Sequence, residues 1–323
     1  MNIEEKNFTT YSRIGSRATY GLVILELVKS NKNIIVIPAD TSTSAGLDRL
    51  KKQFPENYID VGISEQNLIG VATGLSSEGF QVFTSTFAPF QTMRCFEQIR
   101  VNQGYMKHKI CMIGLASGLV LGTLGFTHCC AEDLSVMRSI PNMTVLSPAD
   151  CAETAKAVKA SIDHKDPIYI RLTGGANNPM VYKKDYEFEI GKEVIVKDGD
   201  DVVIFATGTM VFESLEAAKI LESSGINTKV VNIHTIKPFD NHIVNRVASK
   251  AKLIVSAEEH SIIGGLGSCI AEAKTQIKNS PEQLFIGLPS KFSNSGPYKE
   301  MLKSFGLTSE KIAEKILKKI KNV

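Results

Sequence analysis

The chain has 323 residues, enough for about two domains, and 43% of them are hydrophobic against 22% charged. This composition supports a sizeable core and excludes general disorder. The 37 Lys and Arg residues against 34 Asp and Glu leave a net charge of +3, too small and too evenly spread to favour nucleic-acid binding.

The sequence pattern predicts neither a targeting segment nor a membrane span. Residues 1–17 are polar and lack the apolar segment of a signal peptide. The stretch 110–131 has no charged residue, but its glycines and hydroxyl side chains predict a buried strand followed by a loop rather than a membrane span. The six cysteines form no C-x-x-C pair and no zinc spacing, which favours a reduced, cytoplasmic chain.

Helices and short apolar strands alternate through the first 180 residues. Helices are predicted at 17–30, 64–77, 90–103 and 150–163, and strands at 34–37, 59–61, 81–84, 109–115, 144–147 and 168–172. Short all-apolar runs are typical of strands buried on both faces. The pattern predicts a doubly wound parallel α/β domain over residues 1–180.

A second alternating set follows a loop at 174–179 and a charged, aperiodic segment. We expect residues 181–200 to be the linker. Strands are then predicted at 202–206, 229–232, 253–257 and 284–286, and helices at 210–223, 266–277 and 310–320. This set predicts a second doubly wound α/β domain over residues 201–323.

The common short catalytic motifs are absent: the sequence has no G-x-x-x-x-G-K-[ST], no G-x-S-x-G and no H-E-x-x-H. Three features at predicted strand ends nevertheless stand together: Glu65, the pair Phe87 and Phe90, and His128. The ends of parallel strands are where open α/β sheets bind ligands. Each feature alone is also explained by structure, as a helix-start carboxylate, a core pair or a structural histidine.

Several segments together carry a family resemblance. They are Val61–Asn67 (VGISEQN), Ser85–Phe90 (STFAPF), Thr127–His128, Ile140–Asp150 (IPNMTVLSPAD) and Glu258–Ser268 (EEHSIIGGLGS). In order and spacing they resemble the pyrimidine-binding and C-terminal domains of the transketolase family, over nearly the whole chain. The resemblance therefore implies a thiamine diphosphate pyrimidine-binding domain followed by a transketolase C-terminal domain.

The resemblance also implies roles for individual residues. Glu65 would hydrogen-bond the aminopyrimidine ring nitrogen of thiamine diphosphate and promote deprotonation of its thiazolium carbon. Phe87 and Phe90 would surround the pyrimidine, with Met93 in place of a third aromatic residue. Asp40 would lie near the cofactor, and His128 would face the substrate as a second catalytic residue.

The family's diphosphate and metal motif, G-D-G…N, does not occur in the sequence. The chain is therefore identified as the C-terminal subunit of a split transketolase. No metal ligand is expected here, because Mg²⁺ would be held mainly by an N-terminal partner subunit. A site divided between two chains requires their association, and we expect an (αβ)₂ assembly acting on sugar substrates.

The substrate side departs from the family. An acidic residue that reads a sugar hydroxyl is replaced by Leu124, and the phosphate-site histidine and arginine align with Ala116 and Gly174. Two positions that bind the substrate tail, Arg17 and Ser44, are kept. Because a lost arginine is costly for phosphate binding, we expect a non-standard donor: a sulfonated ketose such as 6-deoxy-6-sulfofructose first, or else a deoxy or branched sugar.

Two other interpretations remain open at this point. The β subunit of a 2-oxoacid dehydrogenase shares the architecture and a turn like Ile63–Glu65. The Phe87 and Phe90 pair and the 140–150 segment favour transketolase instead. A non-catalytic paralogue that serves only as a partner subunit would be favoured by loss of Glu65, which is present.

Overall fold

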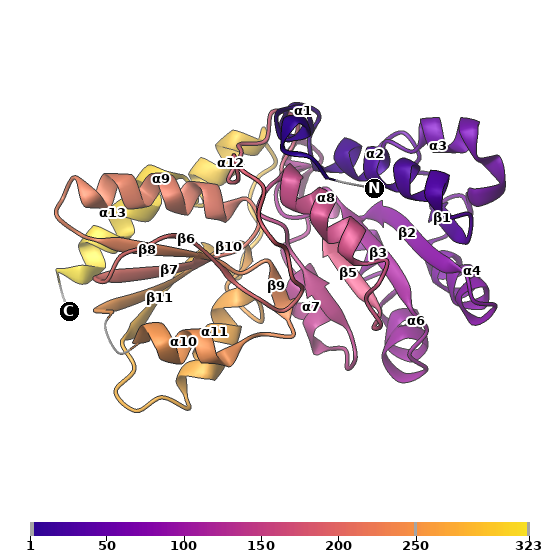
Figure 1. The fold of residues 1–323 in the computed structure, drawn as a ribbon. Coiled ribbons are helices and arrows are strands. Elements are labelled where there is room, and N and C mark those ends of the chain that lie inside the picture. Colours follow the sequence, from indigo (N-terminus) through magenta and orange to yellow (C-terminus); the bar gives the residue numbers. More distant parts are fainter. Residues whose placement is uncertain (1–2, 249–250, 322–323) are drawn as a thin grey trace.

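Two β-sheets with helices on both faces make up the chain (Figure 1). The computed structural model describes residues 3–248 and 251–321. The first sheet has six strands in the order β1-β2-β3-β5-β4-β9, and the second has five in the order β11-β10-β7-β8-β6. The predicted fold class, two doubly wound α/β domains, is confirmed.

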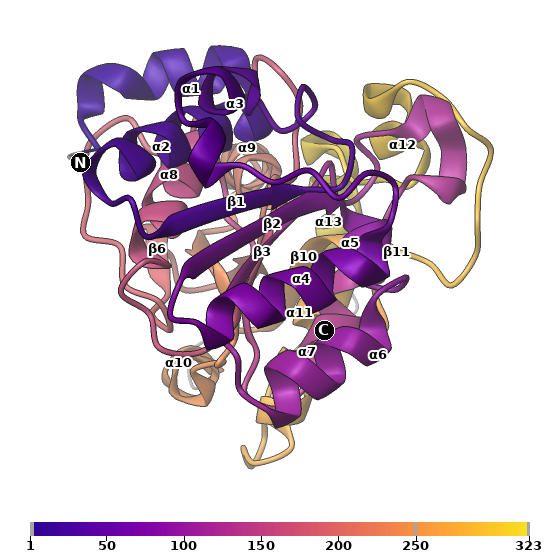
Figure 2. The ribbon, with the colours of Figure 1, turned by 90° about the vertical axis from the view of Figure 1, so that its right-hand side faces the viewer.

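The first sheet lies between two helical layers, as Figure 2 shows from the side. Its strands are β1 (Ile34–Pro38), β2 (Gln81–Phe87), β3 (Ile110–Leu115), β4 (Thr144–Leu146) and β5 (Ile168–Arg171), with β9 (Thr235–Lys237) from the second half of the chain. One layer comprises α1 (Phe8–Ile14), α2 (Ser16–Ser30), α3 (Asp48–Gln53) and α8 (Cys151–Ala160). The other face carries α4 (Glu65–Ser77), α5 (Ala88–Gln91), α6 (Phe96–Ile99) and α7 (Asp133–Ser139).

The second sheet is built in the same way. Its strands are β6 (Val194–Lys197), β7 (Val202–Ala206), β8 (Thr228–Asn232), β10 (Leu253–Ser261) and β11 (Glu282–Leu288). Helices α9 (Met210–Glu222) and α13 (Ser309–Ile320) cover one face, and α10 (Asn241–Ala248) and α11 (Leu266–Lys274) cover the other; α12 (Tyr298–Ser304) lies toward the first domain. Apolar strands such as β7, buried at every position, form the centre of its core.

The two halves of the chain are joined by backbone hydrogen bonds and by a shared hydrophobic core. Strand β9 pairs antiparallel with β4, so that the second half of the chain completes the first sheet. One hydrophobic cluster contains Leu68 of α4, Val145 of β4 and Leu266 of α11, and therefore spans both domains. Their relative position is fixed by apolar burial as well as by hydrogen bonds.

Two predicted elements of the first domain are wrong. Residues 59–61 form no strand: the segment bonds β1 on one side only, with Ile59 N–H donating to Val36 O (3.1 Å) and Val61 N–H to Pro38 O (3.3 Å). The predicted helix 90–103 is broken into α5, α6 and a π-helical turn, Arg100–Tyr105. At the break the Thr92 hydroxyl donates to Ala88 O (2.7 Å), the local bonding by which threonine competes with a continuing helix.

The predicted linker also differs from the structure. Within 181–200, residues Val194–Lys197 form β6, which pairs antiparallel with β8 at the edge of the second sheet. Because charged residues flank this short, half-exposed strand on both sides, its apolar run is hard to recognise in the sequence. Stretch 110–131 holds β3 and then turns, and no helix among the described residues is long and apolar enough to cross a membrane.

Candidate functional site

The candidate residues follow the carboxyl ends of four adjacent parallel strands. Asp40 comes after β1, Phe87 ends β2, Ala116 follows β3 and Gly174 follows β5. The register places Pro38 beside Ser85, Phe87 beside Leu115 and Gly114 beside Arg171, so the four ends lie at one edge of the sheet. That edge is where doubly wound sheets bind ligands.

Glu65 is the first residue of α4, where the helix dipole favours a carboxylate. Its side chain is only 5% exposed, although the turn before it is open to solvent. Among the residues that the structure describes, one charged partner reaches it: Nη1 of Arg94 lies 2.7 Å from Oε1 of Glu65. A buried carboxylate therefore depends on a single guanidinium that is itself 44% exposed.

Aromatic rings stand beside this ion pair. The ring centroids of Phe87 and Phe90 are 6.3 Å apart, and the His128 ring lies 5.3 Å from Phe90 and 6.1 Å from Phe87, all edge to face. The Arg94 guanidinium lies over the Phe90 ring, 3.9 Å from its centroid. We call Glu65, Phe87, Phe90, Arg94 and His128 the edge cluster. The structure brings four sequence-predicted residues together and adds Arg94.

Three other predicted cofactor and substrate residues, Asp40, Met93 and Leu124, lie outside this cluster. Asp40 has a left-handed backbone (φ 54°), and its N–H donates to Asp60 Oδ1 (2.9 Å). Met93 is 41% exposed and Leu124 is 54% exposed. Among the described residues, no side-chain hydrogen bond, ion pair or ring contact joins Asp40, Met93 or Leu124 to the edge cluster.

Arg17 and Ser44 lie on neighbouring segments. Arg17 is in the first turn of α2, and the turn that holds Ser44 packs on the same helix, since a Cβ on Gly21 would lie 2.3 Å from Gly46 O. Within the described part of the chain, no hydrogen bond or ion pair of the Arg17 side chain is found. Burial without a counter-charge lowers the pKa of the Arg17 guanidinium below its ordinary value.

The backbone at Gly174 is closed against a side chain. Its φ is +75°, and a Cβ there would lie 2.4 Å from Oδ1 of the buried Asn178. Asn178 is held in turn by Ser12, whose carbonyl accepts the Asn178 N–H at 3.0 Å. Ala116 also has a left-handed backbone (φ 53°), a conformation that costs energy in a residue with a Cβ.

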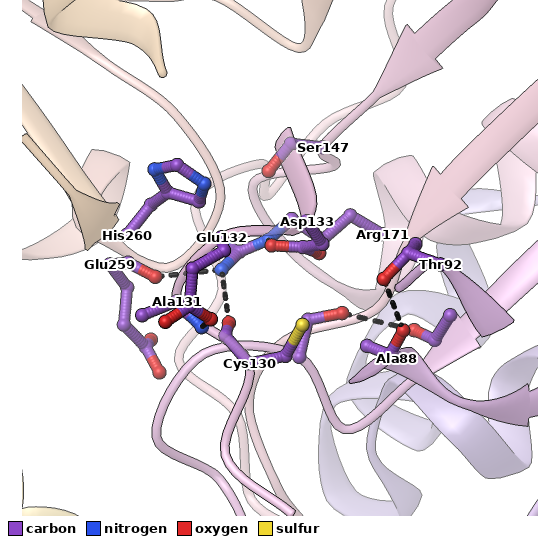
Figure 3. A network of polar contacts seen from close by, with 12 residues as sticks. Ala88, Thr92, Cys130, Ala131, Glu132, Asp133, Ser147, Arg171, Glu259 and His260 are labelled. Atoms are coloured by element: carbon purple, nitrogen blue, oxygen red, sulfur yellow. Dashed lines mark hydrogen bonds and ion pairs between the residues drawn. The ribbon is translucent and has the colours of Figure 1, made fainter. Parts of the chain in front are cut away.

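A second polar cluster lies buried between the domains, and sequence reasoning missed it. Arg171 Nε is 2.9 Å from Asp133 Oδ2, and Arg171 Nη2 donates to Glu259 O at 2.7 Å. Figure 3 shows Arg171 between Asp133, Cys130 and Glu259. Tyr169 adds a hydrogen bond to Asp133 Oδ2 at 2.8 Å. We call Asp133, Tyr169, Arg171 and Glu259 the interface cluster. Its signals in the sequence are Arg171, which ends the otherwise apolar strand β5, and Glu259, which belongs to the Glu258–Ser268 segment.

Glu259 of this cluster and its chain neighbours Glu258 and His260 are strongly desolvated. Glu259 accepts hydrogen bonds from Leu119 N–H, Thr209 and Tyr298, yet burial raises its pKa. Burial raises the pKa of Glu258 to about 7 and lowers the pKa of His260 to about 4. These groups form their hydrogen bonds with other groups of the protein and do not face a cavity, which marks them as structural.

The described residues contain no candidate metal site, because no three or more His, Cys, Asp or Glu side chains are grouped so that they could hold an ion. All six cysteines are buried and free. Desolvation raises the pKa of Cys129 to about 11 and that of Cys95 to about 12. Protonated, buried thiols are poor nucleophiles and poor metal ligands.

Comparison with known families accounts for both domains. Residues 12–178 match the family described as transketolase, pyrimidine binding domain, and residues 191–312 match the transketolase C-terminal domain. Both assignments agree with the family resemblance in the sequence. The second match begins just before β6, which agrees with the place of that strand in the second sheet.

Individual relatives match over almost their whole length. The chain is 38% identical to 6-deoxy-6-sulfo-D-fructose transketolase subunit SqwH of Clostridium sp. (strain MSTE9), covering 92% of this chain and 91% of that protein. It is 33% identical to a subunit of the apulose-4-phosphate transketolase of Phocaeicola vulgatus, over 95% and 98%. A solved structure described as a split gene transketolase, inactive β4 tetramer, matches with a TM-score of 0.84 and 37% identity, over 95% and 98%.

Proposed function

The chain belongs to the transketolase family, a thiamine diphosphate-dependent family of transferases, and we propose that it is the C-terminal subunit of a two-subunit transketolase. Together with an N-terminal subunit it would transfer a two-carbon ketol unit from a ketose donor to an aldose acceptor. The observation that carries this proposal is the edge cluster: a buried carboxylate beside two phenylalanine rings and a histidine, at the carboxyl edge of a parallel sheet.

The residues present fit the pyrimidine half of thiamine diphosphate. When bound, this cofactor supplies a nucleophilic carbon that carries the two-carbon unit. Glu65 would hold the aminopyrimidine nitrogen and exchange a proton with it, and burial of the carboxylate keeps water from competing. Phe87 and Phe90 would contact the ring, Met93 and Asp40 would line its surroundings, and His128 would hydrogen-bond the substrate.

The diphosphate half of the cofactor and Mg²⁺ need a partner. Because no metal-binding group is found among the described residues, we assign those contacts to an N-terminal subunit. The assembly would be (αβ)₂, with each site formed at a subunit interface. The buried, free thiols suit the reducing cytoplasm that the sequence favours.

The donor is proposed to be a ketose whose far end is not an ordinary phosphate ester, with 6-deoxy-6-sulfofructose as the first candidate. Arg17 offers an unpaired, half-buried cation, and Ser44 a hydroxyl nearby. Gly174 has no room for the side chain of a second cation, because Asn178 fills that space. One arginine without a second suits a singly charged sulfonate better than a doubly charged phosphate.

Steady-state kinetics of the reconstituted pair of subunits test this assignment. The donors compared are 6-deoxy-6-sulfofructose, fructose 6-phosphate, xylulose 5-phosphate and a branched phosphoketose, with one common aldose acceptor. We expect the sulfonated ketose to have the highest kcat/KM. If xylulose 5-phosphate exceeds it by more than about tenfold, or 1.4 kcal/mol of transition-state binding, the altered positions 116, 124 and 174 do not set the donor.

A further inference from the structure

Arg94 makes two contacts at once that the proposed function reserves for the cofactor. Its Nη1 pairs with Glu65 at 2.7 Å, and its guanidinium lies over the Phe90 ring at 3.9 Å from the centroid. An aminopyrimidine held by Glu65 and Phe90 would use the same carboxylate and the same ring. Neither the sequence pattern nor the family resemblance gives Arg94 a role.

The chemistry of the two groups explains why one can replace the other. A guanidinium is planar and delocalised, carries N–H donors in its plane and stacks on aromatic faces. An aminopyrimidine is also planar and also packs on aromatic rings, and its edge carries an amino group that donates N–H and a ring nitrogen that can share a proton with a carboxyl group. Arg94 therefore occupies the groups that the cofactor's edge would contact. Without it, the buried carboxylate would have no partner, which would cost free energy.

The surroundings let the side chain leave without moving the backbone. The Arg94 backbone is fixed, because its carbonyl accepts a hydrogen bond from Gln66 Nε2 at 3.1 Å. The side chain is 44% exposed and has no partner besides Glu65 and Phe90 within 3–248 and 251–321. Water can solvate the guanidinium when the Arg94 side chain rotates outward.

We propose that Arg94 is a displaceable counter-ion of Glu65: it neutralises the carboxylate and covers Phe90 in the cofactor-free chain, and leaves both when the aminopyrimidine enters. This rests on the proposed function. Cofactor binding then exchanges the guanidinium for a neutral aminopyrimidine, whose ring nitrogen meets Glu65 through one proton taken up from solvent. The lost ion pair lowers the net affinity. Arg94 is a positioning residue that restrains loading, distinct from the residues that hold the bound cofactor.

The test is the affinity of the reconstituted subunits for thiamine diphosphate with Mg²⁺, measured by calorimetry and by association rate in stopped-flow circular dichroism. We expect Arg94→Met to bind about tenfold more tightly than wild type, a gain of about 1.4 kcal/mol, mostly through faster association. Arg94→Gln, which also removes the charge, should do the same if the Met variant folds poorly. Arg100→Met is the matched control, since Arg100 pairs with Glu97 on the exposed surface, and its affinity should equal wild type.

A double-mutant cycle separates exchange from a merely structural role. In a Glu65→Gln background there is no carboxylate to release, so Arg94→Met should then give little gain. Equal or weaker binding by both Arg94 variants, with normal binding by wild type, overturns the inference and leaves the proposed function intact. If neither wild type nor any Arg94 variant binds the cofactor, the proposed function is contradicted. The inference then falls with it, because variants that lack the Arg94 restraint should bind at least as well as wild type.

Discussion

The edge cluster and the interface cluster both place an arginine against a carboxylate, and they differ in how the pair is enclosed. Arg171 and Asp133 are 0% exposed, and backbone carbonyls and Tyr169 surround them. In the edge cluster the carboxylate is buried, but its arginine reaches solvent and has one carboxylate partner. A pair enclosed by the protein fixes a structure, whereas the partner of the edge-cluster carboxylate is within reach of solvent.

Breaking the enclosed pair should have the largest effect. Asp133→Asn leaves the Arg171 charge buried without its counter-charge, and we expect a loss of about 3–5 kcal/mol in the free energy of unfolding. Urea denaturation followed by far-ultraviolet circular dichroism measures it. The exposed variant Glu97→Gln should leave the curve unchanged. If Asp133→Asn lowers the free energy of unfolding by less than about 1 kcal/mol, the interface cluster does not stabilise the contact between the domains.

Changing the buried carboxylate of the edge cluster should affect turnover rather than stability. Glu65→Gln keeps the size of the side chain but removes the charge and the proton exchange, so kcat in the reconstituted enzyme should fall at least about 100-fold. The denaturation midpoint of the subunit should remain close to that of wild type. Glu97→Gln again serves as the control. Turnover near wild type in Glu65→Gln would remove the cofactor assignment.

The domain boundary also predicts a pH dependence. The His234 carbonyl accepts the Ser147 N–H across the boundary at 2.8 Å, and burial lowers the pKa of the His234 ring to about 4. Between about pH 4 and 6.5 this ring binds a proton in the unfolded chain but not in the folded one, so it makes stability rise with pH. Relative to His234→Gln, wild type should gain about 2–3 kcal/mol over that range.

Denaturant titrations of both proteins at several pH values measure this difference. Other groups, such as Glu258 with its pKa of about 7, act in the opposite direction but contribute equally to both proteins. Parallel profiles for wild type and His234→Gln would show that the ring is not desolvated as the structure indicates.

The smallest effect concerns the loop at the substrate side. Gly174→Ala places a Cβ at a φ of +75° and 2.4 Å from Asn178 Oδ1, and should destabilise the chain by about 1–2 kcal/mol. Gly175→Ala is the matched control, because a Cβ there meets nothing within 4 Å. Asn178→Ser should recover part of the loss in the double variant. Equal melting temperatures for the two alanine variants would show that the loop adapts.

The contrast between the two clusters also explains what the sequence could reveal. Strands such as Ile110–Leu115 and Val202–Ala206 were predictable because apolar runs between turn residues have few other uses. Glu65, Phe87, Phe90 and His128 could be grouped because strand ends converge in this fold. Their actual contacts needed coordinates.

The misses have physical causes. Arg94 follows Met93 in a segment whose pattern predicts one helix, and the break after α5 turns its side chain back toward Glu65. The Arg171–Asp133 pair joins residues 38 positions apart, and no local pattern shows which carboxylate an arginine meets. Strand β9 pairs with a strand of the other domain, a contact that periodicity along the chain does not report.

The central claim is that this chain carries half of a thiamine diphosphate site. Calorimetric titration with thiamine diphosphate and Mg²⁺ into the chain alone, the N-terminal subunit alone and their mixture tests it most directly. We predict binding tighter than about 1 µM in the mixture only, and weak binding by this chain by itself. Binding tighter than about 1 µM by the isolated chain, or none in the mixture, would contradict the account.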